Sequence, residues 1–436
     1  MRISVIGTGY LGAVHAVGMA ELGHTVMGID VDPTKVDTLA AGRAPFFEPD
    51  LDDLLAKHVE SGAVRFSDAF GDTAGADVHF LCVGTPQKRD GLAADLSYVD
   101  AAVDALAPHL DGPCLVVGKS TVPVGTARRL AAQLARAAPA GAAAELAWNP
   151  EFLREGHAIA DTLTPDRLVF GVNSSHAESV LREVYASALD GGTPLVVTDL
   201  PTAELVKVSA NAFLATKISF INAIAEISET TGADVVKIAD AIGYDPRIGR
   251  RFLDAGLGFG GGCLPKDIRA FIARAGEIGA GQSLLFLHEV DAINLRRRER
   301  VAEIAAELVG GTLIGRTVAV LGAAFKPNSD DVRDSPALNV AGRLQLQGAH
   351  VAVYDPRATE NARRIFPTLD YAPSVYEACR GAHVVLHLTE WPEFREIDPA
   401  ELAAVVERPN LVDGRNSLDA DAWRAAGWTY RGLGRP

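Results

Sequence analysis

The glycine-rich turn near the N-terminus is the feature that most constrains this fold. An apolar segment, RISVIG, leads into GTGYLG, in which Gly7, Gly9 and Gly12 have the G-x-G-x-x-G spacing. A helical pattern that ends at Gly23 follows, and a second strand pattern, TVMGID, ends at Asp30, 18 residues beyond Gly12. Strand, turn, helix, strand and acidic residue in this order predict a Rossmann-type unit that binds a dinucleotide.

The spacing has a physical meaning. Glycines let a pyrophosphate approach backbone N–H groups at a helix N-terminus, where the helix dipole favours negative charge. Asp30 would accept hydrogen bonds from the adenosine ribose hydroxyls and repel a 2′-phosphate. We therefore expect NAD, not NADP, as the cofactor.

Size and charge limit the function classes. A chain of 436 residues suggests about three domains. The net charge of −15 argues against nucleic acid or an anionic membrane as the main partner. We expect neither a signal peptide nor a transmembrane helix, since no window approaches about 18 consecutive apolar residues. The four cysteines are far apart and form no CxxC pair, which indicates a reducing cytoplasm and no zinc site.

Polar turns follow further buried strand patterns. ADVHFLCV at 76–83 leads into GTP, CLVVG at 114–118 leads into KSTVPVGT, and PDRLVFG returns to strand. Ligands of open α/β sheets bind outside the carboxyl ends of the strands. Thr85, Ser120 and Thr121 lie at such ends, but each is equally explained as a turn or helix-capping residue.

The segment from Thr202 to about Thr231 predicts one long helix. It has apolar residues at spacings of three and four and contains neither proline nor glycine. About 30 residues correspond to roughly 45 Å, long enough to join two lobes. Lys207 and Asn211 lie four residues apart on one face, and could form a functional pair or be solvated. The charged run RRRER at 296–300 indicates a solvated helix face or a linker.

A second α/β unit is predicted to begin at Thr317. Its first strand and turn, TVAVLGAAFKP, contain Gly322 but no counterparts of Gly9 and Gly12. This unit is therefore not expected to bind a dinucleotide, although strand-end cations could hold a phosphorylated ligand. The fold class is α/β, with two Rossmann-like doubly wound domains joined by a long central helix. We divide the chain into an NAD-binding Rossmann domain (1–198), a central helical domain that contains the cysteine loop (199–300) and a second Rossmann-like domain (301–436).

The loop GLGFGGGCLPKD at 256–267 is a second segment with a candidate reactive residue. Its five glycines precede Cys263, and Lys266 lies three residues beyond the thiol. Nearby positive charge favours the thiolate and hence a nucleophile. A glycine-rich turn with an inert cysteine is an equally good interpretation of this segment alone.

Eight ordered segments resemble the UDP-glucose/GDP-mannose dehydrogenase family over nearly the whole chain. They are GTGYLG with the later acid, FFEPDL, VGTP, STVPVGT, NPEFLREG, ELVKVSANAFLATKISF, FGGGCLPKD and FKPNSDDVRDSPA. The resemblance implies oxidation of the C6 alcohol of a nucleotide-bound hexose to the carboxylate, with two NAD reductions and no metal. It also implies that 199–300 is a dimerisation domain, so that a homodimer or a higher homo-oligomer forms through the long helix, and that 301–436 binds the nucleotide sugar.

The resemblance assigns roles to particular residues. Cys263 matches the nucleophile that forms a thiohemiacetal and then a thioester. Lys207 and Asp267 match the proton-transfer and cationic groups of the first oxidation, and Asn211 matches a residue that holds the oxyanion. Glu151 and Thr121 match residues that position the hydrolytic water. The catalytic set implied is Cys263, Lys207, Asp267, Asn211, Glu151 and Thr121.

Cofactor and substrate contacts carry over in the same way. NAD contacts are implied for Gly7, Gly9, Tyr10, Leu11, Gly12, Asp30, Lys35, Thr85, Pro86, Thr121, Glu155, Lys266 and Arg333. Substrate contacts are implied for Glu151, Phe152, Leu153, Arg154, Glu155, Lys207, Asn211, Arg247, Phe252, Leu253, Gly260, Lys326 and Arg415. Arg247 resembles an arginine that reaches in from a neighbouring subunit. The chain departs from many relatives at Gly262, where they have serine, and we expect altered loop mobility there.

Within the family, IGYDPRIGRRFLDAGLGFGGGC is more like the UDP-glucose branch than the GDP-mannose branch. GDP-mannose and UDP-N-acetylmannosamine remain alternative substrates. Two functions of other classes are also open: a non-catalytic NAD or nucleotide-sugar sensor, and a two-electron hydroxyacid dehydrogenase that would not need Cys263.

Overall fold

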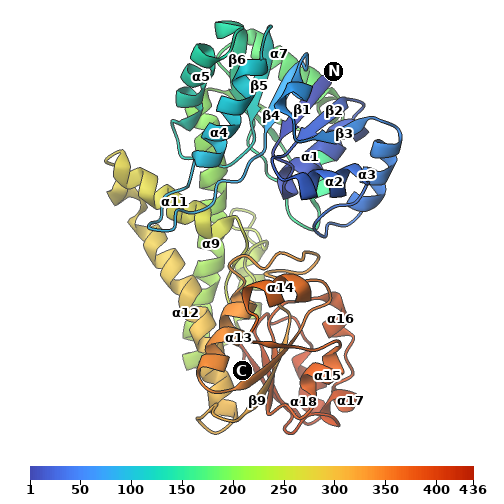
Figure 1. The fold of residues 1–436 in the computed structure, drawn as a ribbon. Coiled ribbons are helices and arrows are strands. Elements are labelled where there is room, and N and C mark those ends of the chain that lie inside the picture. The colour runs from blue at the N-terminus through green and yellow to red at the C-terminus, as the bar shows by residue number, and fades with distance from the viewer. The chain divides into compact units, whose positions relative to one another are not determined.

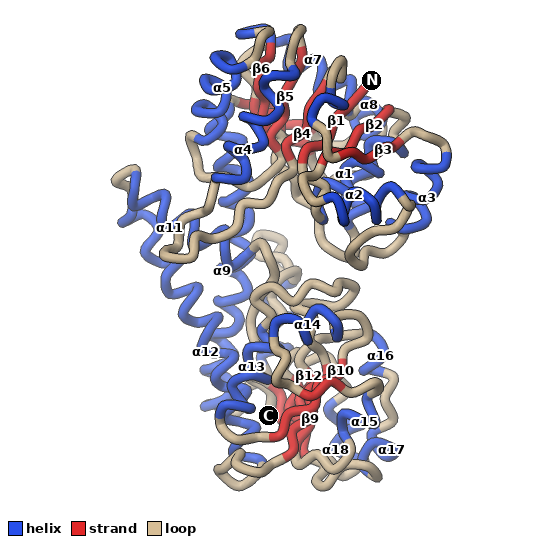
Figure 2. The backbone as a smooth tube through the Cα atoms, viewed as in Figure 1, coloured by secondary structure: helices blue, strands red, loops and turns tan.

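The computed structural model describes residues 1–436 and divides them into two compact units (Figure 1). The first comprises Met1–Ala210 and Arg269–Gly279, and the second Asn211–Ile268 and Ala280–Pro436. The strands of each unit form a central sheet with helices around it (Figure 2). The expectation of an α/β fold with two Rossmann-like sheets and one long helix is confirmed. The division into three domains stays a prediction.

The first sheet has eight strands in the order β3-β2-β1-β4-β5-β6-β7-β8. The first six are parallel in the order of a Rossmann fold, and β7 and β8 run in the opposite direction. The strands are β1 (Arg2–Ile6), β2 (Thr25–Ile29), β3 (Val64–Ser67), β4 (Val78–Leu81), β5 (Cys114–Gly118), β6 (Ala144–Trp148), β7 (Leu168–Gly171) and β8 (Leu195–Thr198).

The helices of this unit connect successive strands. They are α1 (Tyr10–Glu21), α2 (Pro33–Ala40), α3 (Leu51–Glu60), α4 (Ser97–Leu106), α5 (Thr126–Ala137), α6 (Ala158–Leu163), α7 (Ser175–Val184) and α8 (Ala186–Asp190). Residues of β4 and β5 are buried throughout, as expected of apolar strands covered on both faces. The polar turns after these strands therefore lie at the edge of a rigid sheet.

The second sheet repeats the same strand order with six parallel strands, β11-β10-β9-β12-β13-β14. They are β9 (Thr317–Leu321), β10 (His350–Tyr354), β11 (Asp370–Tyr371), β12 (Val384–His387), β13 (Asn410–Asp413) and β14 (Thr429–Gly432). The surrounding helices are α13 (Pro336–Leu346), α14 (Thr359–Ile365), α15 (Val375–Cys379), α16 (Pro392–Arg395), α17 (Pro399–Ala403) and α18 (Ala420–Ala425). The sequence prediction of a second α/β unit from Thr317 is confirmed.

The long helix α9 spans Leu200–Thr231, as the uninterrupted helical pattern predicts. Pro201 lies in its first turn, where a missing N–H costs nothing. By length and mean hydropathy α9 also qualifies as a candidate membrane span, with an 18-residue window at 1.3. In the protein 44% of that window is buried, so packing in the core accounts for part of its apolar character.

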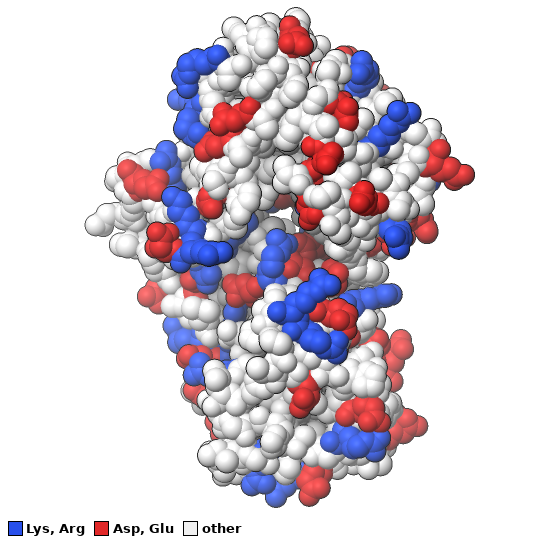
Figure 3. Space-filling view, viewed as in Figure 1, with Lys and Arg blue, Asp and Glu red and all other residues white.

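Three more helices complete the second half of the chain: α10 (Val235–Gly243), α11 (Leu264–Glu277) and α12 (Leu285–Leu308). The RRRER run lies in the middle of α12, and the prediction that it is a solvated face is wrong in part. Arg297 is fully buried and pairs with Glu229 at 2.7 Å, and Arg298 is 2% exposed and pairs with Asp334 at 2.8 Å. These carboxylates neutralise the buried guanidinium groups. They come from distant segments of the chain, so the sequence pattern could not indicate them. Elsewhere on the face shown in Figure 3, basic and acidic side chains are interspersed.

Candidate active site

The glycine turn of the first unit has the geometry of a dinucleotide site. Gly7 follows β1 with a φ of +85°, which residues with a Cβ rarely adopt. A Cβ at Gly12 would lie 1.8 Å from the carbonyl oxygen of Gly7, so the third glycine lets α1 pack closely. Gly9 precedes α1 and has open space in front of it. The N-terminus of α1 can therefore receive a pyrophosphate, and the residues present fit NAD.

Asp30 lies directly after β2 and faces this turn. Its carboxylate accepts a hydrogen bond from the N–H of Thr8 at 2.8 Å and pairs with Lys35 Nζ at 2.9 Å. Burial alone would raise the pKa of Asp30, but the hydrogen bonds from Lys35 and from backbone N–H groups outweigh it and lower the pKa. Asp30 is therefore an ionised acceptor, as recognition of ribose hydroxyls requires.

The loops after β4 and β5 are tied together by hydroxyl groups. Thr85 Oγ1 donates to the carbonyl of Thr121 at 2.8 Å, and Ser120 Oγ donates to the carbonyl of Val83 at 2.6 Å. These hydroxyls cap no helix. They fix the relative position of two strand ends, which places Thr121 at the edge of the sheet.

Glu151 and Lys207 come together in the first unit. Lys207 on α9 is 5% exposed, and its Nζ lies 3.2 Å from Glu151 Oε1, three residues beyond the end of β6. The ring of Phe152 contacts two cations, with Lys207 Nζ at 5.4 Å and the Arg167 guanidinium at 3.8 Å from its centroid. The structure thus joins two of the expected catalytic residues and one expected substrate contact.

The segment beyond Glu151 is held by local and distant carboxylates. Arg154 donates to both oxygens of Asp161, and the N–H of Leu153 donates to Glu151 at 2.8 Å. Glu48, buried before α3, accepts from the N–H of Gly156 at 2.6 Å, directly after Glu155. Glu48 also accepts hydrogen bonds from Ala158 N–H and from the hydroxyl of Tyr10. The expected cofactor residue Tyr10 is thereby linked to the substrate segment.

Cys263, in the second unit, is the exposed cysteine of this chain. The other three cysteines, two of them in the first unit, are buried. Cys263 immediately precedes α11, and its carbonyl accepts from the N–H of Asp267 at 2.9 Å. A thiol at a helix N-terminus is in a position that favours the thiolate. An inert cysteine is typically a buried one, whereas Cys263 is exposed, which favours the interpretation as a nucleophile.

Asp267 lies in the first turn of α11 and is 2% exposed. One carboxylate oxygen accepts from Asn211 Nδ2 at 2.6 Å and the other from Lys266 Nζ at 2.5 Å. Lys207 and Asn211, one turn apart on α9, each have a carboxylate partner: Glu151 for the lysine and Asp267 for the amide. Lys207 and Asn211 are therefore both buried and paired, and the alternative of solvated side chains is wrong for both.

The glycine loop before Cys263 is clamped by Asn294 of α12. Asn294 Oδ1 accepts from the N–H of Phe259 at 2.7 Å, and Asn294 Nδ2 donates to the carbonyl of Phe259 at 3.0 Å. Arg298 donates to the same carbonyl at 3.0 Å. A Cβ at Gly258, whose φ is +95°, would lie 2.3 Å from Asn294 Oδ1. Glycine is thus required where the clamp approaches the loop.

Arg415 is a second anchor of this loop. Its guanidinium donates to the carbonyls of Leu388, Gly258 and Phe325, at 2.8, 3.1 and 3.2 Å. Its backbone N–H donates to buried Asp413 at 3.0 Å. Arg415 thus joins the end of β13 to the glycine loop and to the turn after β9. Lys326, in that turn, lies with its Nζ 5.4 Å from the Phe325 ring centroid.

The departure at Gly262 lies against Arg333. A Cβ there would lie 2.3 Å from the Arg333 guanidinium carbon, so a larger residue requires the end of this side chain to move. Arg333 is held by Asp331 through hydrogen bonds of 2.6 to 3.0 Å. A Cβ at Gly260 would lie 2.2 Å from the carbonyl oxygen of Asp334, which explains why glycine stands at position 260.

The remaining expected substrate residues differ in their surroundings. Phe252 has a φ of +66°, a strained conformation for a bulky residue of the kind found at functional sites. Leu253 is 2% exposed and packs in an apolar cluster with Ile221 of α9, so its side chain serves the core. Arg247 is 88% exposed and pairs with Asp245.

Comparison with known proteins decides the family. The sequence models of the UDP-glucose/GDP-mannose dehydrogenase family match three parts of the chain: the NAD binding domain at 1–189, the central domain at 201–296 and the UDP binding domain at 319–420. The chain belongs to the UDP-glucose/GDP-mannose dehydrogenase family. The expected NAD cofactor is confirmed by this match, as is the enzymatic class of NAD-dependent oxidoreductase acting on nucleotide sugars.

Individual family members are similar over their full length. A UDP-glucose 6-dehydrogenase of Rhizobium meliloti (strain 1021) is 44% identical, with 100% of both chains covered. One of Bacillus subtilis (strain 168) is 41% identical, covering 100% of this chain and 93% of its own. A UDP-glucose dehydrogenase structure from Pyrobaculum islandicum is 39% identical with a TM-score of 0.91, covering 100% and 98% of the two chains. The structure of a UDP-D-ManNAc dehydrogenase from Pyrococcus horikoshii is 27% identical, with a TM-score of 0.87 and coverage of 100% and 99%.

The family motifs did not identify every residue that builds the site. Glu48, Asn294 and Arg298 hold the backbone of two functional segments through buried hydrogen bonds. FFEPDL drew attention to Glu48 without suggesting its role, and no sequence signal marked Asn294. Glu204 on α9 likewise accepts from the N–H groups of Gly125 and Ala127 at 2.7 and 2.6 Å, which holds the STVPVGT segment.

Proposed function

We propose that this chain is an NAD-dependent UDP-glucose 6-dehydrogenase that oxidises the C6 alcohol to the carboxylate in two successive steps. The observation that carries the proposal is the exposed Cys263 at the start of α11, one turn before buried Asp267. A two-electron dehydrogenase needs no such thiol. The curated relatives named UDP-glucose 6-dehydrogenase are 38 to 44% identical, above the 27% of the UDP-D-ManNAc enzyme, which favours UDP-glucose.

The first oxidation needs a proton acceptor for the C6 hydroxyl and positive charge near the developing alkoxide. Lys207 supplies a buried cation, and Asp267 supplies a carboxylate held by Asn211 and Lys266. Asn211 can also donate toward the oxyanion, since a primary amide has two N–H groups. NAD, when bound, accepts the hydrides of both oxidations. The chemistry requires these groups to act on one substrate carbon.

The second oxidation uses Cys263. Its thiolate adds to the aldehyde carbon, and the thiohemiacetal that forms has a C–H bond from which a second hydride can leave. The product is a thioester. Water then adds to the thioester carbon, the C–S bond breaks, and the thiolate returns to Cys263. We assign the proton of that water to Glu151, whose carboxylate pairs with Lys207 and accepts from the N–H of Leu153, and the resemblance adds Thr121 as a residue that positions the water.

The first test counts NADH formed per UDP-glucose consumed with excess NAD. We expect two per sugar from the wild type and no net formation of acid from Cys263→Ala. Cys379→Ala, which removes a buried thiol in the same unit, is the matched control and should still give two. One NADH per sugar from the wild type would contradict the role of the thiol. No turnover of UDP-glucose, with turnover of GDP-mannose or UDP-N-acetylmannosamine, would reassign the substrate, and binding without any NADH would indicate a sensor.

We also propose that the enzyme is a cytoplasmic homodimer, or a higher homo-oligomer, formed through α9. Phe213, Phe220 and Ile227 recur every seven residues on this helix and are 66%, 52% and 58% exposed. Such a stripe is typical of a helix packed against a partner helix. The exposed Arg247 fits a residue that serves a neighbouring subunit. Sedimentation of Phe220→Arg should show dissociation to monomers, whereas Leu346→Arg, at an exposed position in the second unit, should leave the oligomer intact.

A further inference from the structure

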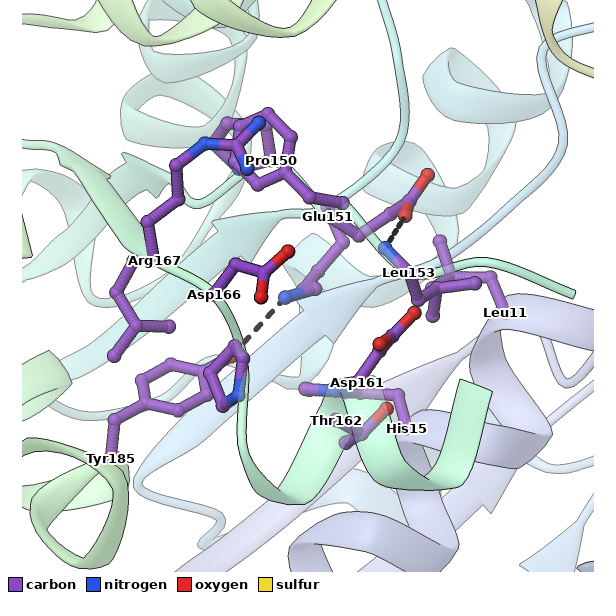
Figure 4. A pocket seen from close by; sticks show the side chains of 14 residues that line it. Leu11, His15, Pro150, Glu151, Leu153, Asp161, Thr162, Asp166, Arg167 and Tyr185 are labelled. Atoms are coloured by element: carbon purple, nitrogen blue, oxygen red, sulfur yellow. Dashed lines mark hydrogen bonds between the residues drawn. The ribbon is translucent and has the colours of Figure 1, made fainter. Parts of the chain in front are cut away.

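A pocket in the first unit is lined by Glu151 together with residues that the chemistry described so far does not use (Figure 4). It has about 40 Å³ of water-accessible space, which is room for roughly two or three water molecules. Its lining includes His15 of α1, Lys119 after β5, Tyr185 after α7, Glu151 after β6, and Asp166 and Arg167 before β7. Asp166 is exposed, whereas His15 and Lys119 are buried, so the pocket connects the surface with the interior beside Glu151.

The environment of His15 indicates that this pocket holds a ligand. The side chain is 2% exposed, and its Nε2 has no hydrogen-bond partner in the protein. A buried polar atom without a partner is costly, and a bound water is the common solution in a polar cavity. Burial and the nearby charge of Lys119 hold the pKa of His15 well below its ordinary value, so the ring is neutral. Nε2 of a neutral imidazole can accept a hydrogen bond from a water, or donate one to it, and so hold that water in place.

Lys119 makes the inner end of the pocket polar. Its Nζ donates to Asn149 Oδ1 at 3.0 Å and to the hydroxyl of Tyr185 at 3.2 Å. Since an ammonium group has three donors, one remains for the pocket. Burial lowers the pKa of Lys119 to about 8, and the other titratable groups that act on it are Cys82, Glu151 and Lys207. Lys119 can therefore give up and regain a proton near neutral pH.

We propose that this pocket binds a chain of ordered waters that carries protons from Glu151, past Lys119 and His15, to solvent at Asp166. The inference rests on the proposed function, because hydrolysis of the Cys263 thioester supplies the protons. Thioester and water give a carboxylate, the Cys263 thiolate and two protons. Glu151 accepts the first proton when the C–O bond forms, and it must lose that proton before the next turnover. The pocket gives it a route that does not pass through the bound substrate.

The decisive variant is His15→Phe. Phenylalanine keeps the edge-on packing of this ring against Phe80, whose centroid is 4.4 Å away, and it removes the unpaired nitrogen. We expect the variant to fold, because an unsatisfied polar atom is replaced by an apolar one. Lys119→Met is less suitable alone, since it leaves Asn149 and Tyr185 without their partner. His79→Phe is the matched control, because His79 is also buried in this unit but bonds Ser4 and does not line the pocket.

Intact-mass analysis of acid-quenched single turnovers separates hydrolysis from the oxidations. In His15→Phe we expect both NADH equivalents at the wild-type rate, but thioester hydrolysis slowed about tenfold or more, with mass retained on Cys263. His79→Phe should hydrolyse normally. A high-resolution crystal structure should show water within hydrogen-bond distance of His15 Nε2. A dry pocket, or normal hydrolysis in His15→Phe, would overturn the proposal. If the wild type itself forms fewer than two NADH and no thioester, the proposed function fails first and removes the proton source.

Discussion

The hydrogen bonds of Asn294 stabilise the glycine loop before Cys263, and their loss has a predictable cost. Asn294 is fully buried on α12 and satisfies both backbone groups of Phe259, four residues before Cys263. Asn294→Ala removes both hydrogen bonds without adding bulk. The loop has five glycines, and the side chains that bury it are those of Leu257 and Phe259, so this substitution should loosen the part around Phe259 directly.

The two lost hydrogen bonds are not equivalent. The carbonyl of Phe259 keeps a second donor, Arg298 at 3.0 Å, so its loss is compensated. The N–H of Phe259 has its acceptor in Asn294 alone, and Phe259 is 6% exposed. A buried donor left without a partner costs about 1–3 kcal/mol, so we expect a loss of about 2 kcal/mol. This loss raises the equilibrium constant for local opening of the loop by a factor of roughly 30.

Two measurements test this value. Amide hydrogen exchange of a peptide covering residues 256–263 should be about 30-fold faster in Asn294→Ala. Urea unfolding followed by tryptophan fluorescence reports mainly on the second unit, which contains Trp391, Trp423 and Trp428. Arg296→Ala is the control, since this exposed neighbour pairs weakly with Glu226 at 3.7 Å and should cost less than about 0.5 kcal/mol. Unchanged exchange together with unchanged unfolding would refute the clamp.

Three further predictions concern other parts of the site. Gly262→Ser should fold with a loss of less than about 1 kcal/mol by thermal unfolding, because the guanidinium it meets is the end of the exposed, flexible Arg333 side chain; a larger loss would mean that the loop is rigid. Asp30→Asn should raise the KM for NAD about tenfold and improve the relative use of NADP, in steady-state assays with each cofactor, because a charged acceptor is lost; equal KM values would contradict its role. Asp413→Asn should cost about 3–5 kcal/mol in urea unfolding at pH 7, because it breaks the buried pair with His387 at 2.9 Å. Burial alone would raise the pKa of Asp413, but His387 and hydrogen bonds hold it below the unfolded value, so this stabilisation is present above about pH 4 and is lost as the pH falls through the folded pKa. The loss in free energy of unfolding caused by Asp413→Asn should therefore become smaller at acid pH, and a loss independent of pH would contradict this account.

Features that depend on neighbours along the chain could be predicted. The glycine spacing and Asp30 predicted the first Rossmann unit, and the uninterrupted period of 202–231 predicted α9, observed as Leu200–Thr231. Strand positions were correct to within a few residues: the pattern at 76–83 became β4, Val78–Leu81. The positions of Cys263 and Asp267 in one helical turn also follow from local spacing. These features depend on backbone sterics and local hydrogen bonds, so nearby residues in the sequence are enough to predict them.

The residues that hold the site in place were decided by tertiary structure. RRRER has the sequence of a solvated run, yet Arg298 is buried because Asp334 and the Phe259 carbonyl come to it from elsewhere in the chain. Lys119 is buried in the same way against Asn149 and Tyr185, 30 and 66 residues away. A side chain that bonds a distant backbone group leaves no periodicity and no fixed spacing. The sequence alone thus determined the fold class and the cofactor and singled out Cys263, whereas long-range hydrogen bonding determined which buried polar residues hold these segments, because those partners meet only when the chain has folded.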